Sequence, residues 1–440
     1  MSVLSWVFHL SDNKSRMCTG LQLYRNLFIF ENMKDIFTMI LAGGRGERLH
    51  PLTADNAKPA VPFGGKYRII DVTLSNAVNS GLRKIAVLVQ YKSLSLDKHI
   101  RRGWNILSSF LDEYIITIPP QQRVSQDWYR GTADAIYQNF YVIEQENPEH
   151  LLILSGDHIY KMDYMEMYKF HKDNNADATV AVIEFDRKEA SSFGILEVDE
   201  DYRIIGFEEK PKNPRTIPGN PNLSLCSMGV YLFNTDVLYS NLEADSKEDT
   251  AHDFGKNIIP GMIKSNRVYA YNFKDLNKKE AKYWRDIGTI DAYWEANLEL
   301  TSVDPVFNLY DKEWPIRTYQ GQYPPAKFVF AQEEEGGRLG IAMDSIVCGG
   351  VIISGGRVQN SVISSNVRIN SYADVRQSVI LENVEVGRFC KINKAIIGKD
   401  VNIPPKTVIG YNLEEDKKRF FVSESGVVVV TRDMKFAEAR

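Results

Sequence analysis

Glycine and arginine are concentrated in the segment Leu41–Leu49, directly after a run of apolar residues. Glycines let a backbone approach phosphate oxygens closely, and arginines and backbone N–H groups donate hydrogen bonds to such an anion. The spacing matches neither the P-loop nor the dinucleotide-binding fingerprint, and a plain glycine turn would not require two arginines so close together. The segment therefore indicates a phosphate-binding loop. Its glycines are Gly43, Gly44 and Gly46, and its arginines are Arg45 and Arg48.

A lysine lies downstream in the segment Ala57–Gly65, where Lys58 precedes Pro59. Next to a phosphate site, a lysine on a stiffened loop is well placed to stabilise a leaving pyrophosphate. A lysine in a loop is usually only solvated, so the interpretation of Lys58 depends on the glycine-rich segment that precedes it.

An acidic residue follows a second apolar run. Leu151–Leu154 is apolar on both faces, as a strand covered by helices on both sides should be, and Asp157 comes shortly after it. This predicts that Asp157 lies at the carboxyl edge of the sheet, where open α/β folds bind ligands. The alternative is that the acid caps the next helix.

These residues together resemble the sugar-nucleotidyltransferase family, whose signature is similar to Leu41–Leu49 with Lys58 and Pro59. Within that family, six further segments resemble the bacterial glucose-1-phosphate adenylyltransferases. The resemblance covers about residues 36–434. The six segments are Trp128–Ala135, Ser155–Tyr160, Phe207–Pro211, Ser227–Gly229, His252–Gly255 and Tyr283–Thr289.

The resemblance implies an enzyme that converts ATP and α-D-glucose 1-phosphate to ADP-glucose and pyrophosphate, the committed step of glycogen or starch synthesis. It implies that Asp157 and Asp286 hold Mg²⁺, an ion that prefers oxygen ligands. Arg45, Arg48 and Lys58 would stabilise the leaving pyrophosphate. Because a sugar phosphate is already ionised near neutral pH, its oxygen needs no general base to attack the α-phosphorus.

The same resemblance implies the remaining binding residues. Gly131 and Thr132 would border the adenine, and the loop glycines the nucleotide phosphates. Lys210 would bind the phosphate of the sugar and Glu209 its hydroxyl groups. Taken singly, these residues have plainer interpretations as turn, strand or solvated surface residues. The expected substrate-binding residues are Tyr129, Gly194, Glu209, Lys210 and Ser227.

An effector site is also implied, because Arg68, Lys399 and Arg432 match basic effector-site positions of the family. Enteric-type members, however, have two basic residues where this chain has Asp55 and Asn56. A carboxylate in place of a lysine repels an anion and removes a donor. We therefore expect an anionic effector at the domain junction, but weak or absent activation by fructose 1,6-bisphosphate.

The elements that would position these residues follow from the pattern of apolar residues. Short apolar runs alternate with helical patterns from Ile36 to about Leu300. This alternation is typical of βαβ units and predicts a Rossmann-like, doubly wound α/β domain with a mostly parallel sheet.

An internal repeat follows a connector rich in proline and tyrosine. Val362, Val379 and Ile396 are 17 residues apart, and each begins a similar segment. Very short strands at a fixed period predict a parallel β-helix, which we expect to be left-handed. The alternative is a β-sandwich with fortuitous spacing. The two outer coils would expose unpaired edges, which favours capping by the C-terminal tail or by another subunit.

Together these patterns divide the chain of 440 residues, which exceeds what one hydrophobic core usually serves. We expect a loosely ordered N-terminal extension at 1–32, a nucleotidyltransferase domain at 33–303, a connector at 304–335 and a β-helix domain with a C-terminal tail at 336–440.

Composition excludes several classes of protein. A net charge of −4 gives no basic field for nucleic acid or an anionic membrane. No apolar run approaches the ~20 residues that a membrane helix needs. The four cysteines lack paired spacing, which favours a reducing, cytoplasmic compartment. The resemblance also implies a homotetramer.

Two other functions stay open. One is a sibling enzyme that transfers a uridylyl or guanylyl group. The other is a non-catalytic regulatory subunit, which would have no chemical need to retain all of Lys58, Asp157, Lys210 and Asp286.

Overall fold

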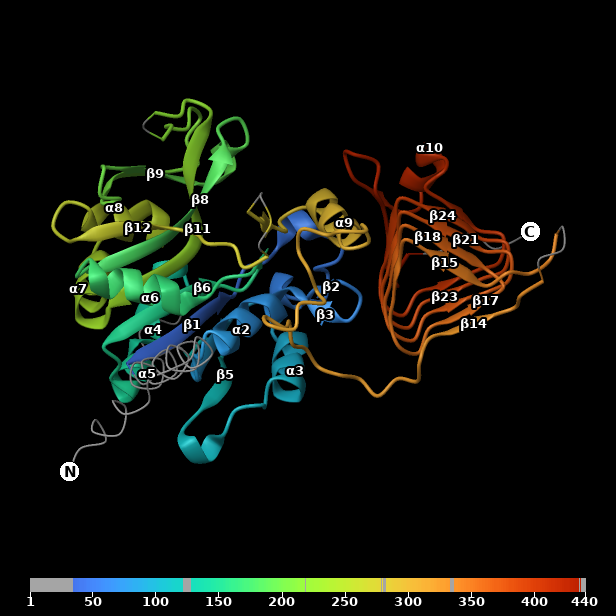
Figure 1. Cartoon of the computed structure of the whole chain (residues 1–440), viewed down its shortest axis with the longest axis horizontal. Helices are drawn as coiled ribbons and strands as arrows, with labels where there is room; N and C mark the ends of the chain where they lie inside the picture. The colour runs from blue at the N-terminus through green and yellow to red at the C-terminus, as the bar shows by residue number, and fades with distance from the viewer. Residues whose placement is uncertain are drawn as a thin grey trace, which may run out of the picture.

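Two bodies make up the described chain, a sheet covered by helices and a solenoid of short strands (Figure 1). The computed structural model describes residues 35–121, 128–217, 219–277, 279, 282–332, 336–434 and 436. The expected N-terminal extension at 1–32 lies outside these residues.

The first body is built on a nine-stranded sheet in the order β10-β9-β11-β6-β1-β4-β5, to which β8 and β12 are joined. Strands β5, β4, β1 and β6 are parallel, whereas β11 runs antiparallel to β6, β8 and β9, so the sheet as a whole is mixed. The strands are β1 (Ile36–Ala42), β4 (Lys84–Val89), β5 (Tyr114–Ile118), β6 (His150–Ser155), β8 (Ala178–Asp186), β9 (Gly194–Val198), β10 (Ile204–Glu209), β11 (Leu223–Asn234) and β12 (Val268–Asn272).

Helices cover both faces of this sheet because its strands bury alternate side chains on opposite sides. In β1, Ile36 and Ile40 belong to one buried cluster, and Phe37 and Met39 belong to the other. The first cluster includes residues of α2 (Ile69–Asn79), α3 (Leu94–Gly103) and α6 (Tyr164–Asp173); the second includes residues of α4 (Thr132–Gln138), α5 (Phe140–Glu146), α7 (Thr235–Ser246), the π-helix η6 (Phe254–Ile258) and α8 (Ile259–Met262).

Several short elements lie at the edge of the sheet where β1 and β6 end. Two of them form a small antiparallel pair, β7 with β13, and two others form the pair β2 with β3. They are η2 (Glu47–Leu49), η3 (Lys58–Ala60), β2 (Pro62–Phe63), β3 (Tyr67–Arg68), β7 (His158–Tyr160), η5 (Ala190–Ser192) and β13 (Trp284–Asp286). The short helix η4 (Ser109–Leu111) instead precedes β5, at the opposite edge of the sheet.

The second body is a parallel β-helix of three sheets, as the repeat of 17 residues predicts. Val362 pairs with Val379 and Val379 with Ile396, which is the register that the spacing requires. One sheet holds β14 (Lys327–Val329), β17 (Ile352–Ser354), β20 (Arg368–Ile369), β23 (Glu385–Val386) and β26 (Asn402–Ile403). The second holds β15 (Ile341–Met343), β18 (Arg357–Gln359), β21 (Asp374–Arg376), β24 (Lys391–Asn393) and β27 (Val408–Ile409). The third holds β16 (Ile346–Val347), β19 (Val362–Ile363), β22 (Val379–Ile380), β25 (Ala395–Ile397), β29 (Val428–Val430) and β28 (Phe421–Val422).

The corners of this β-helix repeat with the same period. Asn366, Asn383 and Asp400 have φ of 59°, 63° and 60°, a left-handed conformation that Asn and Asp tolerate better than most residues. Their side chains form a ladder, in which Asn366 donates to Asn383 at 2.9 Å and Asn383 donates to Asp400 at 2.8 Å. Near the last coils, the chain forms α10 (Leu413–Lys417) and the antiparallel pair β28–β29.

The two bodies share a hydrophobic cluster. It joins Phe63 and Tyr293 of the first body to Val362 and Val379 of the β-helix. Helix α9 (Ile290–Glu299) lies between the two bodies and contacts β22 (Figure 1). Strand β14 lies inside the range 304–335 that we expected for the connector and already pairs with β17, so the β-helix includes this part of the chain.

No helix in the described part of the chain is both long and apolar enough to cross a membrane.

Candidate active site

The loops that follow β1 and β6 meet at the carboxyl edge of the sheet. The two strands are parallel neighbours, with Leu41 opposite Ser155, so both chains leave the sheet at the same place. Gly156 donates its N–H to the carbonyl oxygen of Leu41 at 3.0 Å, which ties the second loop to the first. The glycine-rich loop and Asp157 are thereby placed side by side, as expected for ligand binding at this edge.

A lysine and two carboxylates form the centre of the site. Lys58 Nζ lies 2.7 Å from Asp157 Oδ2 and 2.8 Å from Asp286 Oδ1. Three elements supply these groups: η3 carries Lys58, the loop after β6 carries Asp157, and β13 ends in Asp286. Strand β13 reaches the site because it pairs with β7, which places Asp286 opposite His158.

Burial and charge act in opposite directions on these groups. The Lys58 side chain is only 9% exposed, and burial by itself lowers its pKa, but the two carboxylates outweigh this and raise it above the ordinary value of 10.5. Burial likewise favours the neutral form of Asp157, and the Lys58 ammonium reverses the effect, so the pKa of Asp157 falls well below its ordinary value. Lys58 and Asp157 are therefore both charged at neutral pH.

The donor set fits a magnesium ion. Asp157, His158 and Asp286 each offer one ligand atom, and these atoms lie within 4.8 Å of one another. Two of the three are carboxylates, the oxygen donors that Mg²⁺ prefers. His158 Nε2 lies 3.5 Å from Asp157 Oδ1, and the imidazole ring packs against Trp284 with centroids 4.9 Å apart. This packing supports a structural role for the imidazole ring of His158.

The two arginines of the glycine-rich loop differ in placement. Arg48 Nη2 lies 3.8 Å from Asp286 Oδ2, and the Arg48 side chain is 68% exposed. Arg45 is 74% exposed and lies 3.7 Å from Glu47. The structure therefore brings Arg48 to the carboxylates, whereas Arg45 extends toward solvent at the rim.

Two of the three loop glycines closely approach neighbouring residues of the protein. Gly46 has φ of +64°, and a Cβ there would lie 2.9 Å from the Cβ of Lys58. A Cβ on Gly43 would lie 3.1 Å from the Cβ of Gln90, whereas one on Gly44 would meet nothing within 4 Å. Gly46 thus allows the loop to pack against η3, and Gly44 faces open space.

The expected adenine-binding segment begins helix α4. A Cβ on Gly131 would lie 2.2 Å from the carbonyl oxygen of His252, so only glycine fits there. The Thr132 hydroxyl donates to Asp253 at 3.0 Å and accepts from the N–H of Phe254 at 3.1 Å. This hydroxyl fixes α4 to the start of η6, and the N–H of Ala133 strengthens the link by donating to the carbonyl oxygen of His252 at 2.8 Å.

Tyr129 lies just before this helix. Its hydroxyl accepts a hydrogen bond from Asn139 Nδ2 at 2.8 Å. Burial raises the pKa of Tyr129, so the phenol stays neutral and keeps its proton as a donor.

The expected sugar-binding residues come from three neighbouring strands. A Cβ on Gly194, at the start of β9, would lie 2.8 Å from Glu209 Oε2 at the end of β10. Lys210 follows with φ of +52°, and its 63% exposed side chain places Nζ 3.3 Å from Glu209 Oε1. Ser227 lies where the pairing of β11 with β8 shifts register. A Cβ on Gly229 in this bulge would lie 3.5 Å from His158 Cε1, which links the bulge to the carboxylate cluster.

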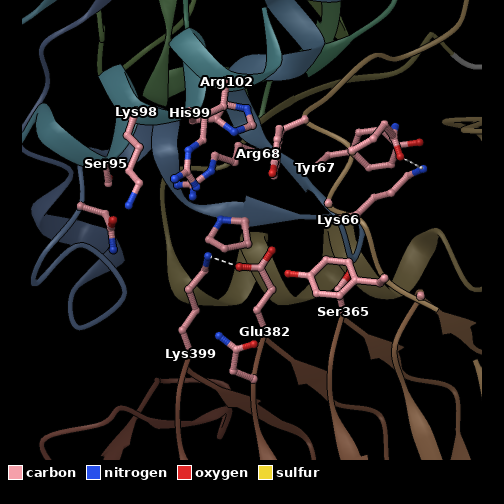
Figure 2. Close-up of a pocket in the computed structure, with 18 residues that line it drawn as sticks. Lys66, Tyr67, Arg68, Ser95, Lys98, His99, Arg102, Ser365, Glu382 and Lys399 are labelled. Atoms are coloured by element: carbon pink, nitrogen blue, oxygen red, sulfur yellow. Dashed lines mark hydrogen bonds and ion pairs between the residues drawn. The ribbon is translucent and has the colours of Figure 1, made fainter.

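The possible effector residues lie at the junction of the two bodies. Arg68 and Lys399 line a cavity of about 640 Å³. Figure 2 shows Arg68 entering this cavity from one side and Lys399, paired with Glu382, from the other. Arg432 lines a second cavity of about 460 Å³, which Lys399 also borders.

Several residues of the site carried no distinct signal in the sequence. The Ser155 hydroxyl donates to Asp157. A Cβ on Gly288 would lie 2.9 Å from Arg48 Nη2, so this glycine makes room for the arginine beside Asp286. Asp253 caps η6 and binds Thr132. All three residues lie inside segments that resemble the family, which is the only signal that could have found them.

Comparison with known proteins agrees with this arrangement. Residues 37–303 match the nucleotidyl transferase family, and residues 324–430 match the GlmU-like C-terminal hexapeptide family. The chain is 54% identical over 409 residues to a glucose-1-phosphate adenylyltransferase of Koribacter versatilis, a match that covers 92% of this chain and 97% of that protein.

Two further relatives carry the same name. The relative from Rhodopirellula baltica is 53% identical over 403 residues, covering 91% of this chain and 90% of its own length. The relative from Methylobacillus flagellatus is 51% identical over 417 residues, a match that covers 94% of this chain and 97% of that protein. With the nucleotidyl transferase fold and the paired carboxylates at the edge of its sheet, the chain therefore belongs to the glucose-1-phosphate adenylyltransferase family.

Proposed function

We propose that this protein is a glucose-1-phosphate adenylyltransferase, which converts ATP and α-D-glucose 1-phosphate to ADP-glucose and pyrophosphate in glycogen or starch synthesis. The observation that carries the proposal is the placement of Lys58 between Asp157 and Asp286, beside the glycine-rich loop. A group of this kind suits two anionic substrates, since it offers a cation and a divalent-metal site at one point.

The chemistry follows from charge and position. The sugar phosphate attacks the α-phosphorus as an anion, so the residues need only hold the reactants in line. Lys210 and Tyr129 hold the sugar phosphate, and Glu209 accepts hydrogen bonds from sugar hydroxyls. The loop backbone with Arg45, Arg48 and Lys58 binds the departing pyrophosphate. Mg²⁺ on Asp157 and Asp286 would neutralise charge on the reacting phosphates.

Pyrophosphate release in the presence of glucose 1-phosphate and each of several nucleoside triphosphates tests this function. We expect ATP to be preferred, whereas a preference for UTP or GTP would identify a sibling enzyme. Absence of turnover with every nucleotide would support a regulatory subunit.

Asp157→Asn tests the mechanism, because the change keeps the shape of the side chain and removes its charge. Loss of one preorganised electrostatic group costs about 100-fold or more in kcat. Asp201→Asn, at an exposed turn between β9 and β10, is the matched control. Wild-type kcat in Asp157→Asn would contradict the assignment.

We also propose that an anionic effector binds in the larger junction cavity. Its lining carries Lys66, Arg68, Lys98, Arg102 and Lys399 against the single carboxylate Glu382. The smaller cavity has two cations, Lys399 and Arg432, and three carboxylates, Asp55, Asp400 and Asp433. The excess of carboxylates over cations disfavours binding of a bisphosphate in the smaller cavity.

Activation assays test the charge argument for the smaller cavity. We expect fructose 1,6-bisphosphate to raise activity less than twofold, whereas strong activation would contradict the charge argument. Asp55→Lys should strengthen the response, because the change converts a repulsive group at the smaller cavity into a donor.

The quaternary state and location complete the proposal. We infer a cytoplasmic homotetramer. The first coil of the β-helix supports self-association, because Phe328 in its edge strand β14 and Phe330 just after it are 46% and 37% exposed. Light scattering coupled to size-exclusion chromatography measures the number of subunits.

A further inference from the structure

We propose that Lys58 is the resident counter-ion of the Asp157–Asp286 pair, and that its ammonium leaves this pair when a divalent cation binds the two carboxylates. The released ammonium then turns to the phosphates at the glycine-rich loop. This inference rests on the proposed function and adds an order of events to it, in which metal loading frees the lysine for the substrate.

The distances make the two occupants mutually exclusive. The ammonium uses Asp157 Oδ2 at 2.7 Å and Asp286 Oδ1 at 2.8 Å. A magnesium ion binds carboxylate oxygens at about 2.0–2.1 Å. An ion held by these same two oxygens would therefore lie where the ammonium now lies.

The outer oxygens of the two carboxylates already have other neighbours. Asp157 Oδ1 accepts a hydrogen bond from Ser155 and lies 3.5 Å from His158 Nε2. Asp286 Oδ2 lies 3.8 Å from Arg48 Nη2. Lys58 bridges the remaining oxygen of each carboxylate, so a cation that binds both of these oxygens competes with Lys58.

The charges of these groups also prevent a divalent cation and the Lys58 ammonium from occupying the same place. Asp157 and Asp286 together carry two negative charges, which one divalent cation balances completely. A buried ammonium a few ångström from that cation would be repelled strongly, because screening is weak at a side chain that is 9% exposed. Without the cation, the same ammonium prevents the two carboxylates from repelling each other.

The backbone around Lys58 allows the side chain to move alone. Arg68 Nη1 donates to the carbonyl oxygen of Ala60 at 2.6 Å, which fixes η3. The Cβ of Lys58 lies against Gly46, so the side chain starts beside the phosphate-binding loop. Its four-carbon stem can reach either the carboxylates or the loop through rotation about its own bonds.

Binding of Mn²⁺ without nucleotide tests the proposal. We expect Lys58→Met and Lys58→Gln to bind Mn²⁺ at least tenfold more tightly than the wild-type protein in calorimetric or electron paramagnetic resonance titrations, because the competing ammonium is absent. Lys58→Arg keeps the charge and should bind within about threefold of the wild type. Arg48→Met removes an exposed cation next to Asp286 and should also stay within about threefold.

Thermal unfolding supplies a second readout that does not depend on catalysis. In EDTA, Lys58→Met should melt at a lower temperature than the wild type, and Mn²⁺ should raise its melting temperature more than that of the wild type. If Lys58→Met does not fold in EDTA, recovery of the folded protein on adding Mn²⁺ supports the proposal, and failure to recover in Lys58→Met and Lys58→Gln alike overturns it.

Two results separate this proposal from the proposed function. Equal or weaker Mn²⁺ binding in both neutral variants, with an active wild-type enzyme, overturns the counter-ion role alone. A wild-type protein that releases no pyrophosphate with any nucleotide overturns the proposed function. If Asp157→Asn and Asp286→Asn leave Mn²⁺ binding unchanged, the carboxylates are not the metal site and the counter-ion role is overturned with it.

Discussion

Lys58 and Asp157 stabilise each other over a defined range of pH. The pKa of Asp157 is depressed, so its contribution is fully present above the ordinary carboxyl value of 3.8 and is lost as the pH falls through the depressed pKa. The pKa of Lys58 is raised, so its contribution is fully present below 10.5 and is lost as the pH rises through the raised value. The pair therefore contributes stability across the whole neutral range.

His150 destabilises the folded protein in mildly acidic solution. Burial and the neighbouring His171 lower the pKa of His150 from 6.5 to about 4. Between these values the unfolded chain binds a proton that the folded protein does not, so stability falls as the pH falls, by about 1.4 kcal/mol per pH unit. The ring packs edge-on against Tyr168 and His171, at 5.2 and 5.4 Å between centroids.

His150→Phe keeps an aromatic ring in this position and removes the titrating group. We expect the free energy of unfolding in urea to fall less steeply between pH 7 and pH 4.5 in this variant than in the wild type. His50→Gln, at an exposed histidine, should keep the slope of the wild type. Parallel slopes for His150→Phe and the wild type would contradict the assignment.

Which residues belong to the site could be predicted from the sequence better than the contacts that their side chains make. Lys58, Asp157 and Asp286 lie in recognisable segments, and the structure brings them together. The sequence predicts that Thr132 borders the adenine and that Arg45 binds the leaving pyrophosphate, but it gives no sign that the Thr132 hydroxyl donates to Asp253 or that Arg45 lies 3.7 Å from Glu47. Such contacts depend on side-chain rotamers and on loops distant in sequence, which no local motif encodes.

Among the elements, η3 connects the junction cavity to the candidate active site. It carries Lys58 at its start and Ala60 at its end, and the Ala60 carbonyl accepts the hydrogen bond from Arg68. Arg68 also lines the larger cavity. An occupant of that cavity that contacts Arg68 therefore acts directly on the element that positions the lysine.

Arg68→Met should lower kcat by about tenfold, because the change leaves the Ala60 carbonyl without its donor and misplacement of a catalytic group by ~1 Å costs up to ~100-fold. Arg102→Met removes a guanidinium from the same cavity and is the matched control, with kcat close to that of the wild type in the absence of effector. Steady-state kinetics with ATP and glucose 1-phosphate measures the kcat of both variants. Equal losses in the two variants would show that only the charge of the cavity matters.

Elements with strong periodicity were predictable, and those that depend on distant pairing were not. The spacing of Val362, Val379 and Ile396 fixes the register of the β-helix because each coil must stack its apolar residues on the next. By contrast, β13 forms only because β7 lies beside it, and this pairing delivers Asp286 to the site. The antiparallel course of β11 likewise depends on neighbours chosen in three dimensions.

Across the whole molecule, α9 holds the β-helix against the catalytic domain. Trp294 Nε1 donates to the carbonyl oxygen of Gln377 at 2.8 Å, and Lys394 Nζ lies 5.4 Å from the centroid of its ring. At the start of the helix, Asp291 Oδ1 accepts hydrogen bonds from Ser423 at 2.5 Å and Ser425 at 2.7 Å. Composition predicts more than one core, but this docking surface depends on the shape of both folded domains.

Trp294→Ala should weaken the docking by about 2 kcal/mol, the order expected for removal of a large side chain from a half-buried interface. Because each domain has a core of its own, loss of docking should let the two domains unfold at different temperatures. Differential scanning calorimetry would then show a broader or divided transition, and protease would cleave the connector between residues 304 and 326 more readily. Tyr310→Ala, at a 76% exposed position in that connector, controls for loss of an aromatic surface residue. A single transition of unchanged width in Trp294→Ala would show that the two domains unfold as one unit without this contact.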